Sequence, residues 1–137
     1  MKRLHFALGL LAAVACSGLH AQNTNVRASI PFDFQIGETR MPAGDYEIRH
    51  EHGWLAVQDQ SGSHVTAAIT TAVDRPPMPT NKAVLQFNRY GEVYFLAKVW
   101  KGDSDTGRSL SKSAQEKELA IHAAGPVQTT TVALQLK

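Results

Sequence analysis

The stretch LQFNRYGEVYFLAKVW, residues 85–100, decides the fold of this chain. Two runs with the alternation of β-strands, residues 85–89 and 93–100, flank Tyr90 and Gly91 at the spacing of a β-hairpin. In the second run apolar side chains fall on both faces of the strand, which is typical of a central strand that is covered on each side. The stretch therefore predicts a hairpin in the middle of a β-sheet.

The same alternation of apolar with smaller or polar residues continues along the chain. It covers residues 32–36, 46–50, 65–73 and 131–136, and turns rich in proline and glycine separate several of these runs. Within the run 65–73 we expect Val65 and Ile69 to face the core. The predicted fold is therefore all-β, a mostly antiparallel β-sandwich or partly open barrel of about seven or eight short strands, with one short α-helix in the C-terminal region.

The helix is predicted from a start signal near the end of the chain. Ser113 and Glu116 have the spacing of a capping box, in which the serine hydroxyl accepts the backbone N–H of the glutamate and the glutamate side chain returns to the serine N–H. Good helix formers follow, and a glycine and a proline end the segment. Because so short a helix is unstable alone, we expect Leu119 and Ala123 to dock on the sheet and to cover the strand 93–100.

Residues 1–21 have the layout of a secretory signal peptide. Two basic residues begin the chain, an apolar run from residue 4 to residue 15 follows, and small residues lead to Ala21. The run is shorter than the roughly 20 residues that span a bilayer as a helix. We therefore predict a signal peptide over residues 1–21 and a single exported β-rich domain, periplasmic or secreted, over residues 22–137.

Cys16 leaves a second processing route open. Residues 13–16 are Ala-Val-Ala-Cys and resemble a lipobox, whose cysteine becomes the lipidated first residue, although Ala13 stands where lipoboxes usually carry leucine. Cleavage after Ala21 is also imperfect, because the bulky Leu19 occupies a position where a small residue is preferred. Both routes export the domain, which would be free in one case and lipid-anchored at Cys16 in the other.

Charge and cysteine content exclude some classes of protein. The chain has 14 Lys and Arg against 12 Asp and Glu, and removal of the signal takes away two of the basic residues. The remaining domain is formally neutral, which argues against nucleic-acid binding. It contains no cysteine, so no disulfide holds it and its stability must come from its core.

The motif His50-Glu51-His52 is a candidate metal site. In a strand both imidazoles point the same way, and His64 or Asp59 could supply a third ligand. Gly44, six residues before His50, resembles the first motif of the cupin β-barrels, but the glutamate that cupins carry after the second histidine is missing. A small metal-dependent, cupin-like enzyme that uses His50, His52 and His64 is therefore one alternative function, with a divalent metal as its cofactor.

Tyr94 and Trp100 form a second candidate site, because they fall on one face of the predicted strand 93–100. Aromatic side chains at this spacing usually belong to the core. If both rings were exposed, they would instead form a platform on which sugar rings or a partner could stack. A carbohydrate-binding module that uses Tyr94, Trp100 and Arg89 is the second alternative function.

Linked motifs over most of the exported part carry a family resemblance. They are Ile30-Pro31-Phe32-Asp33-Phe34, Gly37, Pro42-Ala43-Gly44-Asp45-Tyr46, Phe87-x-Arg89-Tyr90-Gly91-x-x-Tyr94-Phe95-Leu96-x-x-x-Trp100 and Gly107-Arg108-x-Leu110-x-Lys112-Ser113. With these motifs the chain resembles a family of small exported proteins from soil bacteria that has no assigned activity. The resemblance implies a single exported domain and supplies no catalytic residue.

The sequence favours binding over catalysis. The exported part has no cysteine nucleophile and no G-x-S-x-G motif, and it indicates no cofactor outside the metal alternative. We therefore expect a non-catalytic envelope or periplasmic domain that binds an envelope component or a small ligand. The metal-dependent enzyme and the carbohydrate-binding module are the alternatives.

Overall fold

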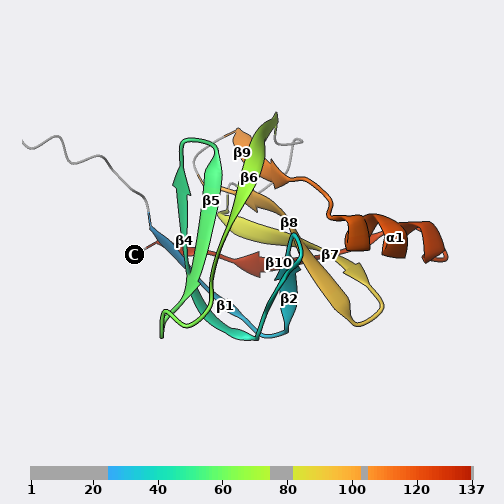
Figure 1. The fold of residues 1–137 in the computed structure, drawn as a ribbon. Helices are drawn as coiled ribbons and strands as arrows, with labels where there is room; N and C mark the ends of the chain where they lie inside the picture. Colours follow the sequence, from blue (N-terminus) through green and yellow to red (C-terminus); the bar gives the residue numbers. More distant parts are fainter. Residues whose placement is uncertain (1–24, 75–81, 103–104, 137) are drawn as a thin grey trace, which may run out of the picture.

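The computed structural model describes residues 25–74, 82–102 and 105–136 (Figure 1). The predicted signal peptide over residues 1–21, with Cys16, lies outside the described residues. Within the described part of the chain, no helix is long and apolar enough to cross a membrane.

Strands make up most of the described chain, and the predicted fold class, all-β with one short helix, is confirmed. The elements in chain order are β1 (Val26–Ile30), β2 (Phe34–Ile36), β3 (Thr39–Met41), β4 (Gly44–Glu51), β5 (Trp54–Asp59), β6 (Val65–Asp74), β7 (Val84–Tyr90), β8 (Val93–Trp100), β9 (Thr106–Leu110), α1 (Ala114–His122), β10 (Gln128–Ala133) and β11 (Gln135–Leu136). The strands exceed the predicted number because β2, β3 and β11 have only three, three and two residues.

The strands form one large mixed sheet that folds over itself into two layers and is not closed into a barrel (Figure 1). Its neighbours run in the order β10-β7-β8-β9-β6-β5-β4-β1-β11, and β2 joins β8 in parallel and β3 in antiparallel pairing. Strand β6 passes from one layer to the other, because residues 65–69 pair with β5 and residues 70–74 with β9. The chain end does the same, since β10 pairs with β7 and β11 with β1.

The core between the layers is built around Phe34, Tyr46 and Phe87, which are almost completely buried. The Phe34 ring meets the rings of Tyr46 and Phe87 edge-on, with centroids 5.1 Å and 5.5 Å apart. The Tyr46 hydroxyl donates to the carbonyl of Pro42 at 2.5 Å, which satisfies the polar end of the buried ring and fixes the chain before it enters β4. Burial is also the largest cause that raises the pKa of Tyr46 above its ordinary value.

The predicted inner face of β6 is wrong. Val65 and Ile69 are 60% and 62% exposed, whereas Thr70 is buried with 5% of its surface exposed. Thr70 stands where β6 leaves β5, and its hydroxyl donates to the carbonyl of Gly53 at 3.0 Å and accepts from Nε of Arg108 at 2.9 Å. These hydrogen bonds determine which face of β6 is buried. A shift of the strand by one residue would turn Thr70 outward and break both bonds.

Helix α1 begins at the predicted cap, but its glutamate acts differently from the prediction. The backbone N–H of Glu116 donates to the Ser113 hydroxyl at 3.2 Å, as expected. The Glu116 carboxylate does not complete the capping box. It accepts instead from Nδ2 of Asn88 at 2.9 Å and from the hydroxyl of Tyr90 at 3.2 Å, two side chains of β7. A polar anchor therefore ties the helix to the sheet.

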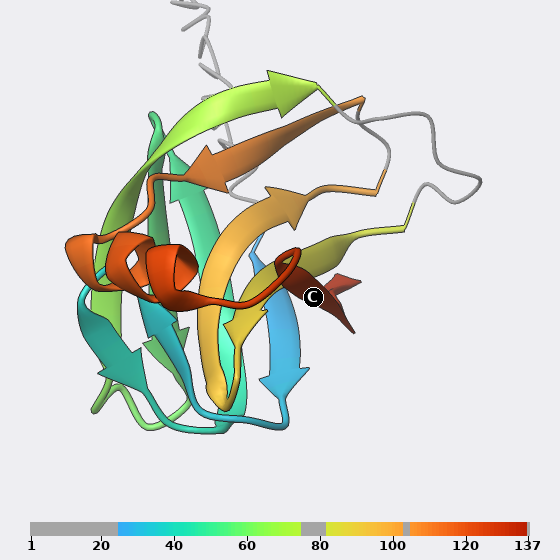
Figure 2. The ribbon, with the colours of Figure 1, turned by 90° about the vertical axis from the view of Figure 1, so that its right-hand side faces the viewer.

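The expected apolar docking of the helix is only partly present. Glu116 is the buried residue of α1, while Leu119 is half-buried and Ala123, just beyond the helix, is exposed. Figure 2 shows α1 lying in front of the layer that contains β7 and β8. One buried carboxylate, rather than an apolar stripe, therefore ties the helix to the sheet, and α1 projects from the side of the molecule (Figure 1).

Replacing Glu116 tests this anchor. We expect Glu116→Ala to lose about 2–3 kcal/mol of unfolding free energy, since two donors on β7 lose their acceptor, and Tyr90→Phe to lose about 1 kcal/mol. Urea unfolding followed by tryptophan fluorescence measures both, with Glu118→Ala on the exposed side of α1 as the control. A loss in Glu116→Ala no larger than in Glu118→Ala would show that the carboxylate does not anchor the helix.

Candidate functional site

A pocket of about 220 Å³ lies where the end of β4, the end of β8 and the start of β9 meet. It is lined by His50, Leu55, Val99, Lys101, Thr106, Gly107 and Arg108. Leu55 and Val99 are buried core residues and give it an apolar floor. His50, Lys101 and Arg108 bring basic groups to it, and we call it the basic pocket.

His50 enters the basic pocket from β4. It lies opposite Leu55 of β5, and because cross-strand neighbours share a face of the sheet, His50 lies on the inner side. Its Nε2 atom is buried and has no hydrogen-bond partner among the described residues. Buried polar atoms are normally hydrogen-bonded. The fold therefore leaves one hydrogen-bonding capacity of His50 unused, at an atom that has no surface open to solvent in this structure.

Arg108 enters the basic pocket from β9, in the other layer. It lies opposite Val99 of β8, which places it on the inner side as well. Its Nε donates to Oγ1 of Thr70 and its Nη2 to the Thr70 carbonyl, both at 2.9 Å. Thr70 in turn donates through its backbone N–H to the carbonyl of Gly53 in the β4–β5 turn at 2.8 Å. The guanidinium is therefore held in a fixed orientation by both layers.

Positive charge dominates the basic pocket. Burial is the largest cause that lowers the pKa of His50 below its ordinary value of 6.5, and the charges of Arg108, Lys101 and His52 lower it further. The ion pairs of the described side chains lie elsewhere, and none of them involves Lys101 or Arg108. Within the described structure, no ion pair therefore neutralises Lys101 or Arg108.

The three histidines of the predicted metal site do not meet. Strand β4 ends at Glu51, so His52 lies in the following turn, exposed but close enough for its charge to act on His50. His64 lies beyond the other end of β5, where its Nδ1 contacts Oδ2 of Asp59 at 3.0 Å. Across residues 25–74, 82–102 and 105–136, no three His, Cys, Asp or Glu side chains are placed to hold a metal ion.

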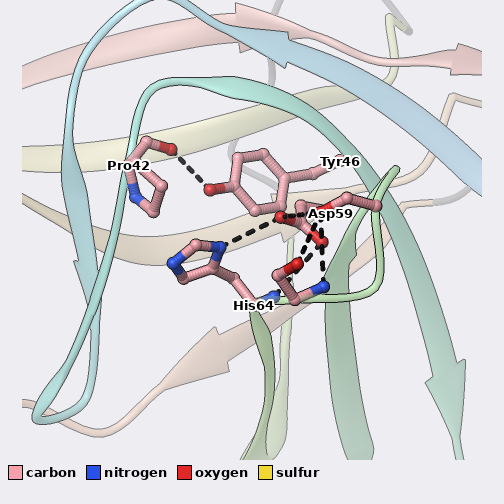
Figure 3. Close-up of polar contacts among 6 residues, drawn as sticks. Pro42, Tyr46, Asp59 and His64 are labelled. Atoms are coloured by element: carbon pink, nitrogen blue, oxygen red, sulfur yellow. Dashed lines mark hydrogen bonds and ion pairs between the residues drawn. The ribbon is translucent and has the colours of Figure 1, made fainter.

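The Asp59–His64 pair organises the turn between β5 and β6 (Figure 3). The Asp59 carboxylate accepts from the backbone N–H of His64 at 3.2 Å and from the Ser61 hydroxyl at 2.9 Å. The bond from the His64 side chain is the largest cause that holds the pKa of Asp59 at about 2. Because the Ser61 hydroxyl donates to Asp59 rather than to the His64 ring, this arrangement does not activate a serine nucleophile.

The predicted sugar platform is not exposed as a unit. Trp100 is buried, with 4% of its surface exposed, and its Nε1 donates to Gln86 at 3.2 Å. Its ring lies over Gly107, where any Cβ would overlap it. Tyr94 is half-buried and stacks on Phe32, with ring centroids 3.9 Å apart. Both aromatic side chains therefore contribute to packing.

Arg89, the third residue of that predicted site, lies in another part of the surface. Its Nε donates to the carbonyl of Gly91 at 2.7 Å, and its guanidinium lies 5.4 Å from the centroid of the Tyr94 ring. It lines a pocket of about 400 Å³ between the β7–β8 turn and the end of α1, together with Leu119 and Val127. The structure does not bring Arg89 to the basic pocket.

Sequence reasoning missed Lys101 and Arg108 as site residues. Neither belongs to a motif of catalytic or metal chemistry, and Arg108 reaches His50 only because β9 pairs with both β6 and β8. One signal was available, since Arg108 stands in the motif Gly107-Arg108-x-Leu110 that the family resemblance singled out.

Comparisons with known proteins do not point to a function for this chain. No protein-family model matches the chain, and no curated protein or solved structure matches it significantly. The resemblance to small exported proteins of soil bacteria therefore stays a prediction from the sequence motifs.

The turn around Asp59 makes a testable prediction about pH. We expect the Asp59 carboxyl to titrate at about 2, and His64→Ala to move its midpoint toward the ordinary value of 3.8, since the largest cause of the shift is removed. Because the pKa is lower in the folded than in the unfolded chain, the contribution of this carboxylate to stability is present above about pH 4 and is lost as the pH falls through its folded pKa.

Side-chain ¹³C NMR titration measures both midpoints. Ser63→Ala, in the same turn, serves as the control and should change the Asp59 midpoint little. A midpoint in the unmodified protein close to 3.8 would contradict the hydrogen-bond network described here.

Proposed function

We propose that this protein is a non-catalytic exported domain that binds a small ligand, or a group of an envelope component, in the basic pocket. The observation that carries the proposal is the buried Nε2 atom of His50, an unpartnered polar atom in a residue that lines the pocket. The pocket volume of about 220 Å³ suits one functional group or a small ligand rather than a large one.

Rigid elements build the basic pocket, which supports a binding role. His50 stands on β4 and Arg108 on β9, and the bonds of Thr70 to Arg108 and to Gly53 join the two layers beside them. An arginine that is already held in place loses little conformational freedom when a ligand binds. Binding energy is therefore available for affinity rather than for ordering the site.

The chemistry of the lining favours holding a ligand over transforming it. The described side chains of the pocket include no carboxylate and no thiol. General acid–base catalysis by His50 would need a second group to orient the ring or to act as its counterpart. The described lining supplies hydrogen-bond donors and positive charge instead.

Export is proposed from the sequence. The predicted signal peptide over residues 1–21 supports it, and lipidation at Cys16 would keep the domain at the membrane surface. In both cases the basic pocket would meet ligands outside the cytoplasm.

The two alternatives have less support. A metal enzyme loses its third ligand, because His64 lies at the far end of β5 from His50 and His52. The charges of Lys101 and Arg108 also oppose a cation near His50. A carbohydrate-binding module is less well supported because Trp100, one of the two aromatic residues of the predicted platform, is buried and cannot stack on a sugar ring.

Amide chemical-shift mapping tests the proposal. The isotope-labelled protein is titrated separately with sodium sulfate, glucose and zinc chloride, as probes for an anion, a sugar and a metal. We expect sulfate or glucose to shift the amide signals of His50, Lys101 and Gly107 saturably, because these residues line the pocket. No covalent change of the probe should accompany binding.

The other possible maps would overturn the proposal. Shifts confined to Tyr94 and Arg89 with glucose would favour the carbohydrate-binding module. Saturable shifts with zinc at His50 and His52, and with no other probe, would favour the metal-dependent enzyme. If none of the three probes shifts the signals of the basic pocket, the proposed function fails.

A further inference from the structure

We infer that the basic pocket binds an anionic group of its ligand, a carboxylate, sulfate or phosphate, which Arg108, Lys101 and Nε2 of His50 hold together. The inference rests on the proposed function and names the chemical class of its ligand. The observation behind it is that these three side chains reach one pocket from three segments of the chain, and that no described carboxylate pairs with either cation.

Arg108 gives the pocket its geometric specificity. Its guanidinium is oriented by the two bonds that Nε and Nη2 donate to Thr70, while the same side chain lines the pocket. A guanidinium is planar and presents its N–H groups as a fork that matches the oxygens of a carboxylate, sulfate or phosphate. An arginine that is already positioned by the fold therefore needs little rearrangement to bind such a group.

Lys101 supplies the second positive charge. It directly follows Trp100, the last residue of β8, and it is exposed, so its ammonium group can move toward an entering ligand. An ammonium group acts as a compact point charge and donates hydrogen bonds in several directions. Lys101 therefore adds attraction without restricting the shape of the anion.

His50 supplies the third contact from the opposite layer. A small rotation of the ring opens its buried Nε2 to the pocket, where it donates to an oxygen of the ligand when this nitrogen carries the ring proton. A neutral imidazole can make this bond, so no change in the charge of His50 is required. The bond would satisfy the polar atom that the fold leaves unpartnered.

The surroundings of the three groups strengthen the preference for an anion. Leu55 and Val99 form an apolar floor, and charges interact more strongly beside such a surface than in open water. The charges that act on His50 come from Arg108, Lys101 and His52, and all three are positive when protonated. A cation would meet repulsion at the same place.

Sulfate is the probe for this inference. It is titrated into the labelled protein against sodium chloride at equal ionic strength, so that general screening is the same in both series. We expect sulfate, and not chloride, to shift the His50 and Gly107 amides saturably. Lys101→Glu should weaken the apparent sulfate affinity at least about tenfold.

Lys117→Glu is the matched control. It changes the net charge by the same amount, but it lies on the exposed side of α1, so it should leave the sulfate affinity within about twofold. Arg108→Lys keeps the charge and removes the fork, and it should also weaken binding about tenfold. Thermal unfolding of Arg108→Lys is measured in parallel to check that it folds. If it does not fold, Lys101→Glu alone decides the test, because Lys101 is exposed and its replacement should not disturb folding.

A second arm separates two sources of the anionic group. Vesicles of phosphatidylglycerol present a phosphate at a lipid surface, whereas sulfate is free in solution. If the protein binds sulfate but not the vesicles, the natural ligand is a free anion. If it also binds the vesicles and sulfate competes with them, the natural ligand is an anionic group at a lipid surface. Both results support the inference.

Two results would overturn the inference. If glucose shifts the pocket signals and sulfate does not, the proposed binding function stands and the anionic class is wrong. If Lys117→Glu weakens sulfate binding as much as Lys101→Glu does, overall charge rather than the basic pocket attracts the anion. The failure of every probe at the pocket would remove the proposed function itself.

Discussion

The hydroxyl of Thr70 is the contact on which the arrangement of the molecule depends. It donates to the carbonyl of Gly53 in the β4–β5 turn and accepts from Nε of Arg108 on β9. Thr70 also marks the point where β6 changes its partner from β5 to β9. One buried polar side chain therefore joins the two layers, and it places Arg108 of one layer beside the pocket that His50 enters from the other.

Local sequence signals predicted much of the fold. The features that they did not predict depend on contacts between residues far apart in the sequence. The alternation of apolar residues and the cap at Ser113 depend on neighbours in sequence, so the strands and the helix start are confirmed. Alternation gives the period of a strand but not its buried face, and in β6 the distant partners of Thr70 decide the face. The anchoring of Glu116 by β7 depends on residues 26 and 28 positions away, which no local pattern indicates.

The candidate site was only partly predictable for the same reason. The sequence singled out His50, but the H-x-H argument assumed that the strand continued through His52, and β4 ends one residue earlier. The third proposed ligand, His64, is separated from His50 by the length of β5, which residue types alone do not reveal. Lys101 and Arg108 line the same pocket as His50 through sheet topology, which brings positive charge to a residue that the sequence predicted as a metal ligand.

The most direct test of this account is a crystal structure grown in selenate, with data collected at the selenium absorption edge. Selenate has the shape and charge of sulfate, and the anomalous signal of its selenium locates it directly. The account predicts an anomalous peak in the basic pocket, within hydrogen-bonding distance of Nε2 of His50 and of the Arg108 guanidinium. A basic pocket without selenate, and with a carboxylate of the same chain paired to Arg108, would contradict it.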